Sequence, residues 1–477
     1  MNPRAPMAAD HTPAHTPAGT APYDPAYDPL VSDGPGHDRA YAPTWWAASA
    51  GPAPEDDGPI RGDVDADVVI IGSGFTGLAT ALFLAREHGI KAVVLEANQV
   101  AWGCTSRNGG QGQNASGRLY RSQWIERWGL DVARQLDEEI RFGFRTFSDL
   151  VAEVDCDAQP GGHLWIAHRQ KKMEFLARET EVMRRHFGYD ARMVSAGELR
   201  EQWCDDHDAH GALYESEGIS VHPLKLAHGY LRLSRAAGAR VHPASPVTGW
   251  HTVGGVHHLR TPGGTVRARA VGIATGAYTA PGLHPSLRHR HFPVLSNCLV
   301  TRPLTEDELA ATRFKTRIAL TDTRTLRFYY RLLPGNRLQI GSRSAITGAD
   351  AHQPQHHRLL TEGLARKFPP LAGIQVDHAW WGWVDVSHDM MPRVWQPDPA
   401  QQVFYALGYG GNGVSFSAHA GRRMAQRIAG QQDPQLQALP IYRDALPFPA
   451  QGEWAAHFRR LGQSVLYKWY WLKDEIL

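Results

Sequence analysis

A glycine-rich turn carries the sharpest chemical signal in this sequence of 477 residues. Gly72, Gly74 and Gly77 follow a short apolar run, and Glu96 ends the next one. Gly72 permits a tight turn, Gly74 lets the backbone approach a pyrophosphate, and Gly77 lets the following helix pack close to the strand. The helix N-terminus offers free N–H groups to phosphates, and Glu96 can accept hydrogen bonds from ribose hydroxyls. The pattern predicts an adenine-dinucleotide site. Its predicted contacts in the turn are Gly72, Gly74, Phe75, Thr76 and Gly77.

Two later segments favour a flavin dinucleotide over a nicotinamide one. At residues 270–277 a buried strand ends in Thr-Gly, where the backbone can pass close to a ligand. At residues 406–413 a strand runs into four glycines and then into a helix. A second helix N-terminus suits a flavin, because its dipole stabilises the negative charge of the reduced ring. Taken alone, the first segment is more typical of an ordinary strand-to-loop turn, and for the second a surface glycine loop is the alternative interpretation. The predicted contacts are Val247, Thr275, Gly276, Gly410, Gly411, Asn412 and Gly413.

The loop at residues 103–111 follows Glu96 closely and should return to the cofactor cleft. Its serine and arginine can reach a phosphate or the isoalloxazine, and its glycines permit close backbone contact. A flexible surface loop is the alternative interpretation. The predicted contacts are Ser106, Arg107, Gly109, Gly110 and Gln111.

A predicted strand at residues 328–331 supplies candidates for the substrate wall. Alternation along a strand places Tyr329 and Arg331 on one face and Tyr330 on the other. Arginine is the natural clamp for a carboxylate because it is planar and binds in a bidentate manner; a solvated or ion-paired surface arginine is the alternative. Arg343 is a further candidate. The predicted catalytic residues are Arg331, Tyr329 and His388.

Alternating strands and helices would position these residues. An apolar run at 68–71, a helical pattern at 78–88 and a second run at 91–96 form a complete βαβ unit. Further helices are predicted at 125–154, 173–187, 224–237, 357–368 and 414–429. Further strands are predicted at 163–168, 270–274 and 403–407, with β-structure over 291–345. The pattern predicts an α/β fold.

Composition excludes several classes of protein. Apolar residues make up 42% and charged residues 21% of the chain, and the formal net charge of +2 gives no basic footprint for nucleic acid. No secretory signal and no apolar window of about 18 residues is present, so no membrane span is predicted. The four cysteines are far apart, which predicts reduced thiols in a cytoplasmic protein and no metal site. Residues 1–40 are poor in large apolar side chains and are expected to form a disordered tail.

Taken together, GSGFTG, Glu96, GCTSRNGGQ, ATGAY and GYGGNGV resemble the D-amino-acid oxidase, glycine oxidase and sarcosine oxidase superfamily. The resemblance is strongest to the branch of gamma-glutamylputrescine oxidoreductases. That branch is similar in the aromatic segment at 41–46, in Val-His-Pro-Leu-Lys at 221–225 and in Phe-Tyr-Tyr-Arg at 328–331. The resemblance extends over about residues 41–477.

The resemblance implies a Rossmann-like FAD-binding domain of the glutathione-reductase type with an interleaved α+β substrate domain. The FAD-binding domain is expected at 62–120, 196–290 and 378–435, the substrate domain at 121–195 and 291–377, and a C-terminal extension at 436–477. FAD should be non-covalent, because no cysteine lies in residues 408–413.

The implied reaction oxidises the C–N bond of a small-molecule amine or amino acid. Hydride passes to flavin N5, the imine hydrolyses, and oxygen or another acceptor takes the electrons. The alternatives are an NAD-dependent dehydrogenase, a flavin monooxygenase, an FAD-dependent dehydrogenase of another substrate, or a non-catalytic flavin-binding subunit. The sequence leaves the amine, the electron acceptor and the oligomeric state open.

Overall fold

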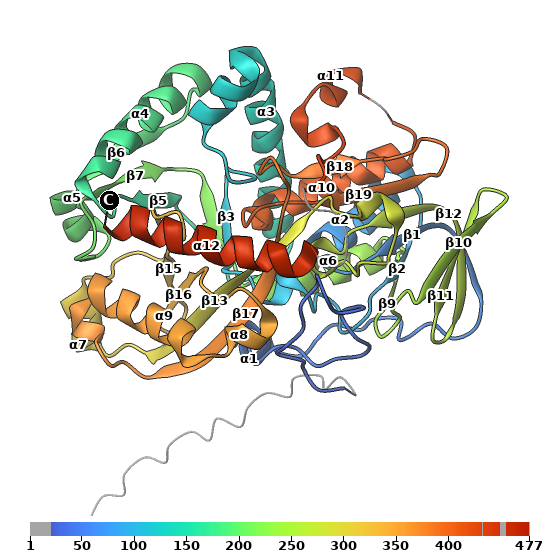
Figure 1. Ribbon diagram of the computed structural model, residues 1–477, viewed down its shortest axis with the longest axis horizontal. Helices are drawn as coiled ribbons and strands as arrows, with labels where there is room; N and C mark the ends of the chain where they lie inside the picture. Colours follow the sequence, from blue (N-terminus) through green and yellow to red (C-terminus); the bar gives the residue numbers. More distant parts are fainter. Residues whose placement is uncertain (1–20, 432, 449–454, 477) are drawn as a thin grey trace, which may run out of the picture.

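Two eight-stranded sheets organise the chain (Figure 1). The computed structural model describes residues 21–431, 433–448 and 455–476. In Figure 1 the first sheet lies on the right and the second on the left. A small third sheet has the order β3-β8-β4. Its strands are β3 (Gln111–Gln113), β4 (Gln159–Pro160) and β8 (Gly218–Ser220).

The first sheet is built on five parallel strands, in the order β9-β2-β1-β12-β19. Antiparallel strands extend it: β11 and β10 beyond β12, and β18 beside β19. The strands are β1 (Val64–Ile71), β2 (Val93–Leu95), β9 (Arg240–His242), β10 (Gly249–Val253), β11 (Val256–Thr261), β12 (Gly264–Ile273), β18 (Arg393–Trp395) and β19 (Val403–Leu407). The parallel β1–α2–β2 unit confirms the predicted Rossmann-like domain.

The second sheet has the order β17-β13-β16-β15-β14-β5-β7-β6. Its strands are β5 (His163–Ile166), β6 (Ala191–Ser195), β7 (Gly211–Glu215), β13 (Phe292–Pro303), β14 (Ala319–Asp322), β15 (Tyr329–Leu333), β16 (Arg337–Ser342) and β17 (Val376–Val386). Both β7 and β17 fall in segments expected for the FAD-binding domain. They join this sheet instead, because β7 pairs with β5 and β6 and β17 pairs along its length with β13.

Helices cover both sheets and link them. They are α1 (Trp45–Ser49), α2 (Phe75–His88), α3 (Arg121–Ala152), α4 (Gln170–Phe187), α5 (Ala196–Gln202), α6 (Pro223–Ala236), α7 (Glu306–Thr312), α8 (Gly348–Ala351), α9 (Pro354–Lys367), α10 (Gly413–Ile428), α11 (Pro434–Gln437) and α12 (Ala455–Glu475). Five short 3₁₀ turns complete the described elements: η1 (Cys104–Ser106), η2 (Gly276–Tyr278), η3 (Pro285–Leu287), η4 (Pro369–Leu371) and η5 (Pro440–Tyr442). None of the helices in the described ranges is long and apolar enough to cross a bilayer.

A buried carboxylate joins the long helix α3 to α10. Glu139 of α3 accepts two hydrogen bonds from the Arg423 guanidinium of α10, both at 2.7 Å, and one from His419 at 2.6 Å. The hydroxyl of Tyr442 donates to the same carboxylate. Burial alone would raise the pKa of Glu139, but His419 and Arg423 outweigh it and hold that pKa well below its ordinary value. The bonds from His419 and Arg423 to Glu139 therefore hold α3 against α10.

The N-terminal segment is packed against the body from residue 21 onward. Only 4% of Tyr27 is exposed, and its carbonyl accepts a hydrogen bond from the Trp383 indole at 3.0 Å. Asp28 pairs with Arg460 of α12 at 2.6 Å. The expectation of a disordered tail over residues 1–40 is therefore wrong for 21–40, because these partners lie more than 300 residues away and leave no mark on local composition. Residues 1–20 lie outside the described residues.

Candidate functional site

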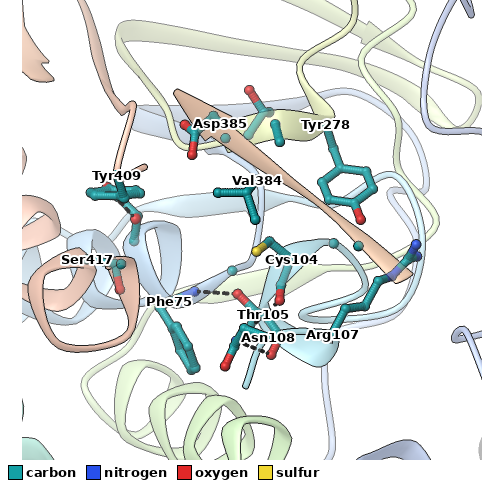
Figure 2. Close-up of a pocket in the computed structure, with 18 of the residues that line it drawn as sticks. Phe75, Cys104, Thr105, Arg107, Asn108, Tyr278, Val384, Asp385, Tyr409 and Ser417 are labelled. Atoms are coloured by element: carbon teal, nitrogen blue, oxygen red, sulfur yellow. Dashed lines mark hydrogen bonds between the residues drawn. The ribbon is translucent and has the colours of Figure 1, made fainter. Parts of the chain in front are cut away.

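The principal pocket lies where the first sheet meets the second. It is lined by the α2 N-terminal turn, the loop at 102–111, η2 and the N-terminus of α10. Figure 2 shows these elements converging, with Cys104 and Thr105 near the centre and Asp385 and Tyr409 toward the upper left. The predicted cofactor residues that line it are Gly72, Gly74, Phe75, Thr76, Glu96, Arg107, Gly109, Gln111, Val247, Thr275, Gly276, Gly411, Asn412 and Gly413. The predicted residues that do not are Gly77, Ser106, Gly110 and Gly410.

The glycine turn has the geometry that a dinucleotide site requires. Gly72 has a φ of +99°, and a Cβ there would lie 2.7 Å from the Ala274 carbonyl oxygen. A Cβ on Gly77 would lie 1.8 Å from the Gly72 carbonyl oxygen, so Gly77 acts by close packing and not by ligand contact. Gly74 is the N-cap of α2 and has no side chain that could cap the helix. The Phe75 amide already donates to the Thr105 hydroxyl at 3.2 Å, so the amides that follow it in the first turn of α2 are the ones open to an anion at the pocket.

Glu96 is 9% exposed and is held at the end of β2. Its carboxylate accepts from the Ser73 amide at 3.0 Å, the Ser73 hydroxyl at 2.8 Å and the Asn98 amide at 3.1 Å. Burial raises the pKa of Glu96. A carboxylate has about four acceptor positions, so these bonds leave capacity for a ribose hydroxyl in the pocket.

Two buried tryptophans position the loop at 102–111. The Trp46 indole donates to the Asn108 carbonyl and the Trp380 indole to the Arg107 carbonyl, each at 2.8 Å. Ser106 donates to the Trp102 carbonyl at 3.0 Å and so turns away from the pocket. The prediction that Ser106 contacts the cofactor is therefore not supported, since its hydroxyl is bonded to a backbone carbonyl of the same loop. Trp46 and Trp380 position the loop without touching the pocket.

Four buried polar atoms at the pocket have no partner among the described residues: Arg107 Nη2, Gln111 Nε2, Arg327 Nε and Ser417 Oγ. The Arg107 guanidinium lies over the Trp102 ring, 4.2 Å from its centroid. Buried polar groups are normally hydrogen-bonded, so this set fits a ligand rich in nitrogen and oxygen atoms. An isoalloxazine ring system is such a ligand.

The N-terminus of α10 is the second helix end at the pocket, as predicted. Its N-cap Asn412 makes no side-chain capping bond, which leaves the first-turn N–H groups open. Asp385 holds the preceding turn: its carboxylate accepts from the Gly408 amide at 2.5 Å, and its carbonyl accepts from the Gly410 amide at 2.9 Å. Gly410 therefore supports the turn instead of lining the pocket. Burial raises the pKa of Asp385. No sequence pattern marked Asp385, because an acid in a strand is not distinctive.

Of the two predicted substrate residues on β15, Tyr329 lines the pocket and Arg331 does not. The Tyr329 side chain lines the pocket, and its hydroxyl lies 3.1 Å from the Ser296 hydroxyl. Arg331 faces the same way, as alternation predicts, but lies behind Gly110, where an added Cβ would be 2.5 Å from the guanidinium. Arg331 donates to the Val221 carbonyl at 2.7 Å, and burial lowers its pKa to about 9. Arg331 therefore lies behind the loop, bonded to Val221, whose amide donates to the Gly110 carbonyl at 2.8 Å, and it does not line the pocket.

His388 also lies outside the pocket. It is exposed, and its ring packs against Phe448 with centroids 5.4 Å apart. The prediction of a catalytic His388 is therefore corrected: β17 has ended at Val386, and the chain beyond it turns toward the surface.

Three arginines whose charges repel one another form a wall of the pocket: Arg118, Arg327 and Arg343. None pairs with a carboxylate in the described part of the chain. Arg118 donates to the Thr325 carbonyl at 3.2 Å, and Arg343 donates to the Gly410 carbonyl at 3.0 Å. Burial, followed by repulsion from the other two arginines, lowers the pKa of Arg118 well below its ordinary value. Of the three, the sequence pointed only to Arg343, because solitary arginines in loops carry no periodic signal.

The chain is similar to known proteins over most of its length. The DAO family, described as FAD dependent oxidoreductase, matches residues 67–427. Gamma-glutamylputrescine oxidoreductase of Escherichia coli K12 is 32% identical over 443 residues, which covers 91% of this chain and 99% of that protein. Sarcosine oxidase subunit beta of an Arthrobacter species is 27% identical over 398 residues, covering 78% and 89%. The crystal structure of glycine oxidase from Geobacillus kaustophilus superposes with a TM-score of 0.66 at 21% identity, covering 82% of this chain and all of that one.

Proposed function

Because the chain belongs to the DAO family of FAD-dependent oxidoreductases, we propose that it oxidises the C–N bond of an amine that carries a carboxylate. Bound FAD supplies the oxidising power by accepting a hydride from the carbon that bears the nitrogen. The single observation that supports a carboxylate-bearing substrate is the wall of three arginines without an acidic partner in the described chain.

The arginine wall has two effects on such a substrate. Its guanidinium groups offer forked N–H donors to a carboxylate, which in turn neutralises buried positive charge. The same cations and the loss of water lower the pKa of the bound amine. A neutral amine has the lone pair that assists loss of the α-hydride, whereas an ammonium does not. The imine product then hydrolyses in water.

The pocket positions the reactants without a side chain dedicated to proton transfer. Glu96 and Asp385 are the buried carboxyl groups that line it, and both are held by backbone amides. Glu96 is assigned to the ribose, and Asp385 orients the turn before α10. Tyr329 and Ser296, hydrogen-bonded to each other, add polar groups to the pocket lining, and the Tyr329 ring lies beside Gly109.

We further propose that FAD is bound without a covalent link. Cys104 lines the pocket, but burial raises the pKa of its thiol to about 12. The thiolate is the nucleophilic form of cysteine, so a thiol held protonated is a poor candidate for attack on the flavin.

By analogy with the gamma-glutamylputrescine, sarcosine and glycine enzymes, the substrate is a small-molecule amine such as a gamma-glutamylated diamine. Oxygen is the proposed acceptor and would give hydrogen peroxide. All four cysteines are free thiols, which supports a cytoplasmic enzyme.

Anaerobic reduction tests the proposal. The purified holoenzyme is mixed without oxygen with a panel of amines, N-methyl amino acids, amino acids, alcohols and 2-hydroxy acids, and the visible flavin absorbance is followed. We expect a carboxylate-bearing amine to bleach the flavin and air to restore the colour with release of peroxide. If a 2-hydroxy acid or alcohol bleached it while every amine failed, the C–N assignment would be refuted.

A further inference from the structure

The outer face of the C-terminal helix α12 carries most of the exposed large apolar side chains of the described chain. Seven lie on α12 and the residue after it: Phe458, Leu461, Val465, Leu466, Trp469, Trp471 and Ile476. The rest of the described chain has four, far apart in sequence: Val31, Val253, Met390 and Leu446. Figure 1 shows α12 along the near face of the molecule, with no described element in front of it. Single apolar residues are normal on a protein surface, but such a concentration marks an interaction surface.

Helix geometry gathers these side chains into one stripe. At about 100° per residue, four of them fall within about 80° of one another around the helix axis. They are Leu461, Val465, Trp469 and Ile476, and each is more than half exposed. The Ile476 amide donates to the Leu472 carbonyl at 3.0 Å and so continues the last turn. The stripe is therefore roughly 23 Å long, at 1.5 Å per residue.

The opposite side of α12 is polar and buried. Arg460, Gln463 and Asp474 are only 7%, 6% and 4% exposed. Arg460 pairs with Asp28 at 2.6 Å, and Asp474 accepts from the Thr325 amide at 2.5 Å. A helix on the surface of a globular protein normally turns its apolar stripe toward the core. In α12 this arrangement is reversed, so polar bonds hold the helix to the body and its apolar stripe faces outward.

The charges beside the stripe are positive. Lys468 and Lys473 are exposed and lie on either side of it around the helix axis. The two acids of the helix face the body, since Asp474 is buried and Glu475 is engaged in an ion pair. Burial lowers the pKa of Lys172 of α4, Asp474 opposes that shift and Lys473 adds to it, so a third cation lies near this end of α12. An apolar stripe between cations matches a surface that is anionic outside and apolar beneath.

A lipid surface fits this pattern better than a second copy of the chain. Soluble oligomers are mostly symmetric, so two copies would pair α12 with α12 about a two-fold axis. Lys468 lies near the middle of the stripe, and an antiparallel pair would place it beside its own copy, where like charges oppose association. At an anionic lipid surface the lysines face phosphate groups instead. Trp469 then lies at the boundary between headgroups and acyl chains, where tryptophan is enriched.

We propose that α12 docks the enzyme onto the surface of an anionic membrane. The helix would lie in the plane of the interface, with Leu461, Val465 and Trp469 against the acyl chains and the two lysines at the headgroups. It would rest on the bilayer without crossing it, in keeping with the lack of a membrane-spanning helix in the described ranges. The docking is independent of the proposed reaction, because none of these side chains lines the principal pocket.

Vesicle flotation of the full-length holoenzyme tests the docking. The probes are vesicles of equal parts phosphatidylglycerol and phosphatidylcholine, and vesicles of phosphatidylcholine alone. Val465→Asp places a charge in the stripe. Val253→Asp is the matched control, because it places the same charge on the β10–β11 hairpin at a valine of equal exposure, 61% in both cases. A double variant, Lys468→Gln with Lys473→Gln, removes the cations and keeps the stripe.

We expect the wild type and Val253→Asp to float with the anionic vesicles and to bind the neutral ones at least tenfold more weakly. Val465→Asp should lower the affinity for anionic vesicles at least tenfold, because it removes apolar burial and adds repulsion. The lysine double variant should lower it about 25-fold, or about fivefold for each cation. If Val465→Asp also lowered the melting temperature, the lysine variant alone would decide.

Three results would overturn the docking. One is a wild type that does not float or that binds neutral and anionic vesicles equally. Another is equal flotation of the two valine variants together with unchanged flotation of the lysine variant. The third concerns a second copy of the chain: a wild-type dimer in analytical ultracentrifugation that Val465→Asp converts to a monomer, without flotation of either, would assign the stripe to self-association.

Discussion

Replacing Arg343 by methionine tests whether the arginine wall binds the substrate carboxylate. Arg343 gives one N–H to the Gly410 carbonyl at 3.0 Å, and a guanidinium has five in total, so donors are left for a ligand. Loss of one charge-assisted hydrogen bond costs about 1.5–3 kcal/mol. Since about 1.36 kcal/mol corresponds to a factor of ten, kcat/KM for a carboxylate-bearing amine should fall about 10- to 150-fold.

Steady-state kinetics with two amines isolate that effect. The loss should be confined to the amine with a carboxylate, and its methyl ester should be oxidised by wild type and variant at similar rates. Arg343→Lys keeps the charge but not the planar fork, so its kcat/KM for the carboxylate-bearing amine should lie between those of the wild type and Arg343→Met. Arg331→Met is the matched control: it removes another buried guanidinium, but one that lies behind Gly110 and donates to Val221.

Arg331→Met should lower the melting temperature and loosen FAD binding, because it removes the bond to Val221, the residue whose amide donates to the Gly110 carbonyl. It should not discriminate between the acid and its ester. The assignment would be wrong if Arg343→Met slowed both substrates equally. A selective loss for the carboxylate substrate in Arg331→Met would restore Arg331 as the clamp.

Four further outcomes are expected. Glu96→Gln should weaken FAD binding about tenfold or more through loss of charge-assisted hydrogen bonds, measured as FAD released on dilution; unchanged retention would remove Glu96 from the site. Arg460→Met should lower the melting temperature and expose residues 21–40 to proteolysis, because it breaks the pair with Asp28; equal resistance to protease would show that the segment is held elsewhere. The lowered pKa of Glu139 means that its stabilisation is present above the unfolded value of about 4.3 and is lost as the pH falls toward the folded value. Glu139→Gln should therefore lower the melting temperature at neutral pH and flatten its decline in acid, and an equally steep decline would contradict this. Finally, kcat/KM should rise with pH above neutrality, because an aliphatic amine has a pKa near that of lysine, about 10.4; a flat profile would argue against a neutral amine as the reactive form.

Local sequence patterns were sufficient for the elements of the cofactor site. The apolar run before Gly72 and the helical spacing after it predicted β1 and α2, and Gly89 ends α2 in the left-handed conformation, with a φ of +68°. The same holds for β19 and α10 around the four-glycine segment. These features are visible in sequence because each depends on neighbours within a few residues: strand period, helix period and the backbone freedom of glycine.

The substrate side of the site could not be predicted in this way. Tyr329 and Arg331 share a face of β15, as alternation requires, yet Gly110 and Val221 separate Arg331 from the pocket. Which residues share a face is a local property of the strand, whereas what lies in front of that face is set by chain segments more than a hundred residues away.

The sequence by itself therefore determined the cofactor class, the βαβ unit and most of the predicted cofactor residues that line the pocket. Only the tertiary structure decided that Arg118 and Arg343, from segments far apart in the chain, stand together at the pocket, and that Asp28 anchors α12. The physical reason is that isolated charged residues carry no periodicity. Their roles depend on which partners folding places beside them, and partial burial without an opposite charge is what points to a ligand at these arginines.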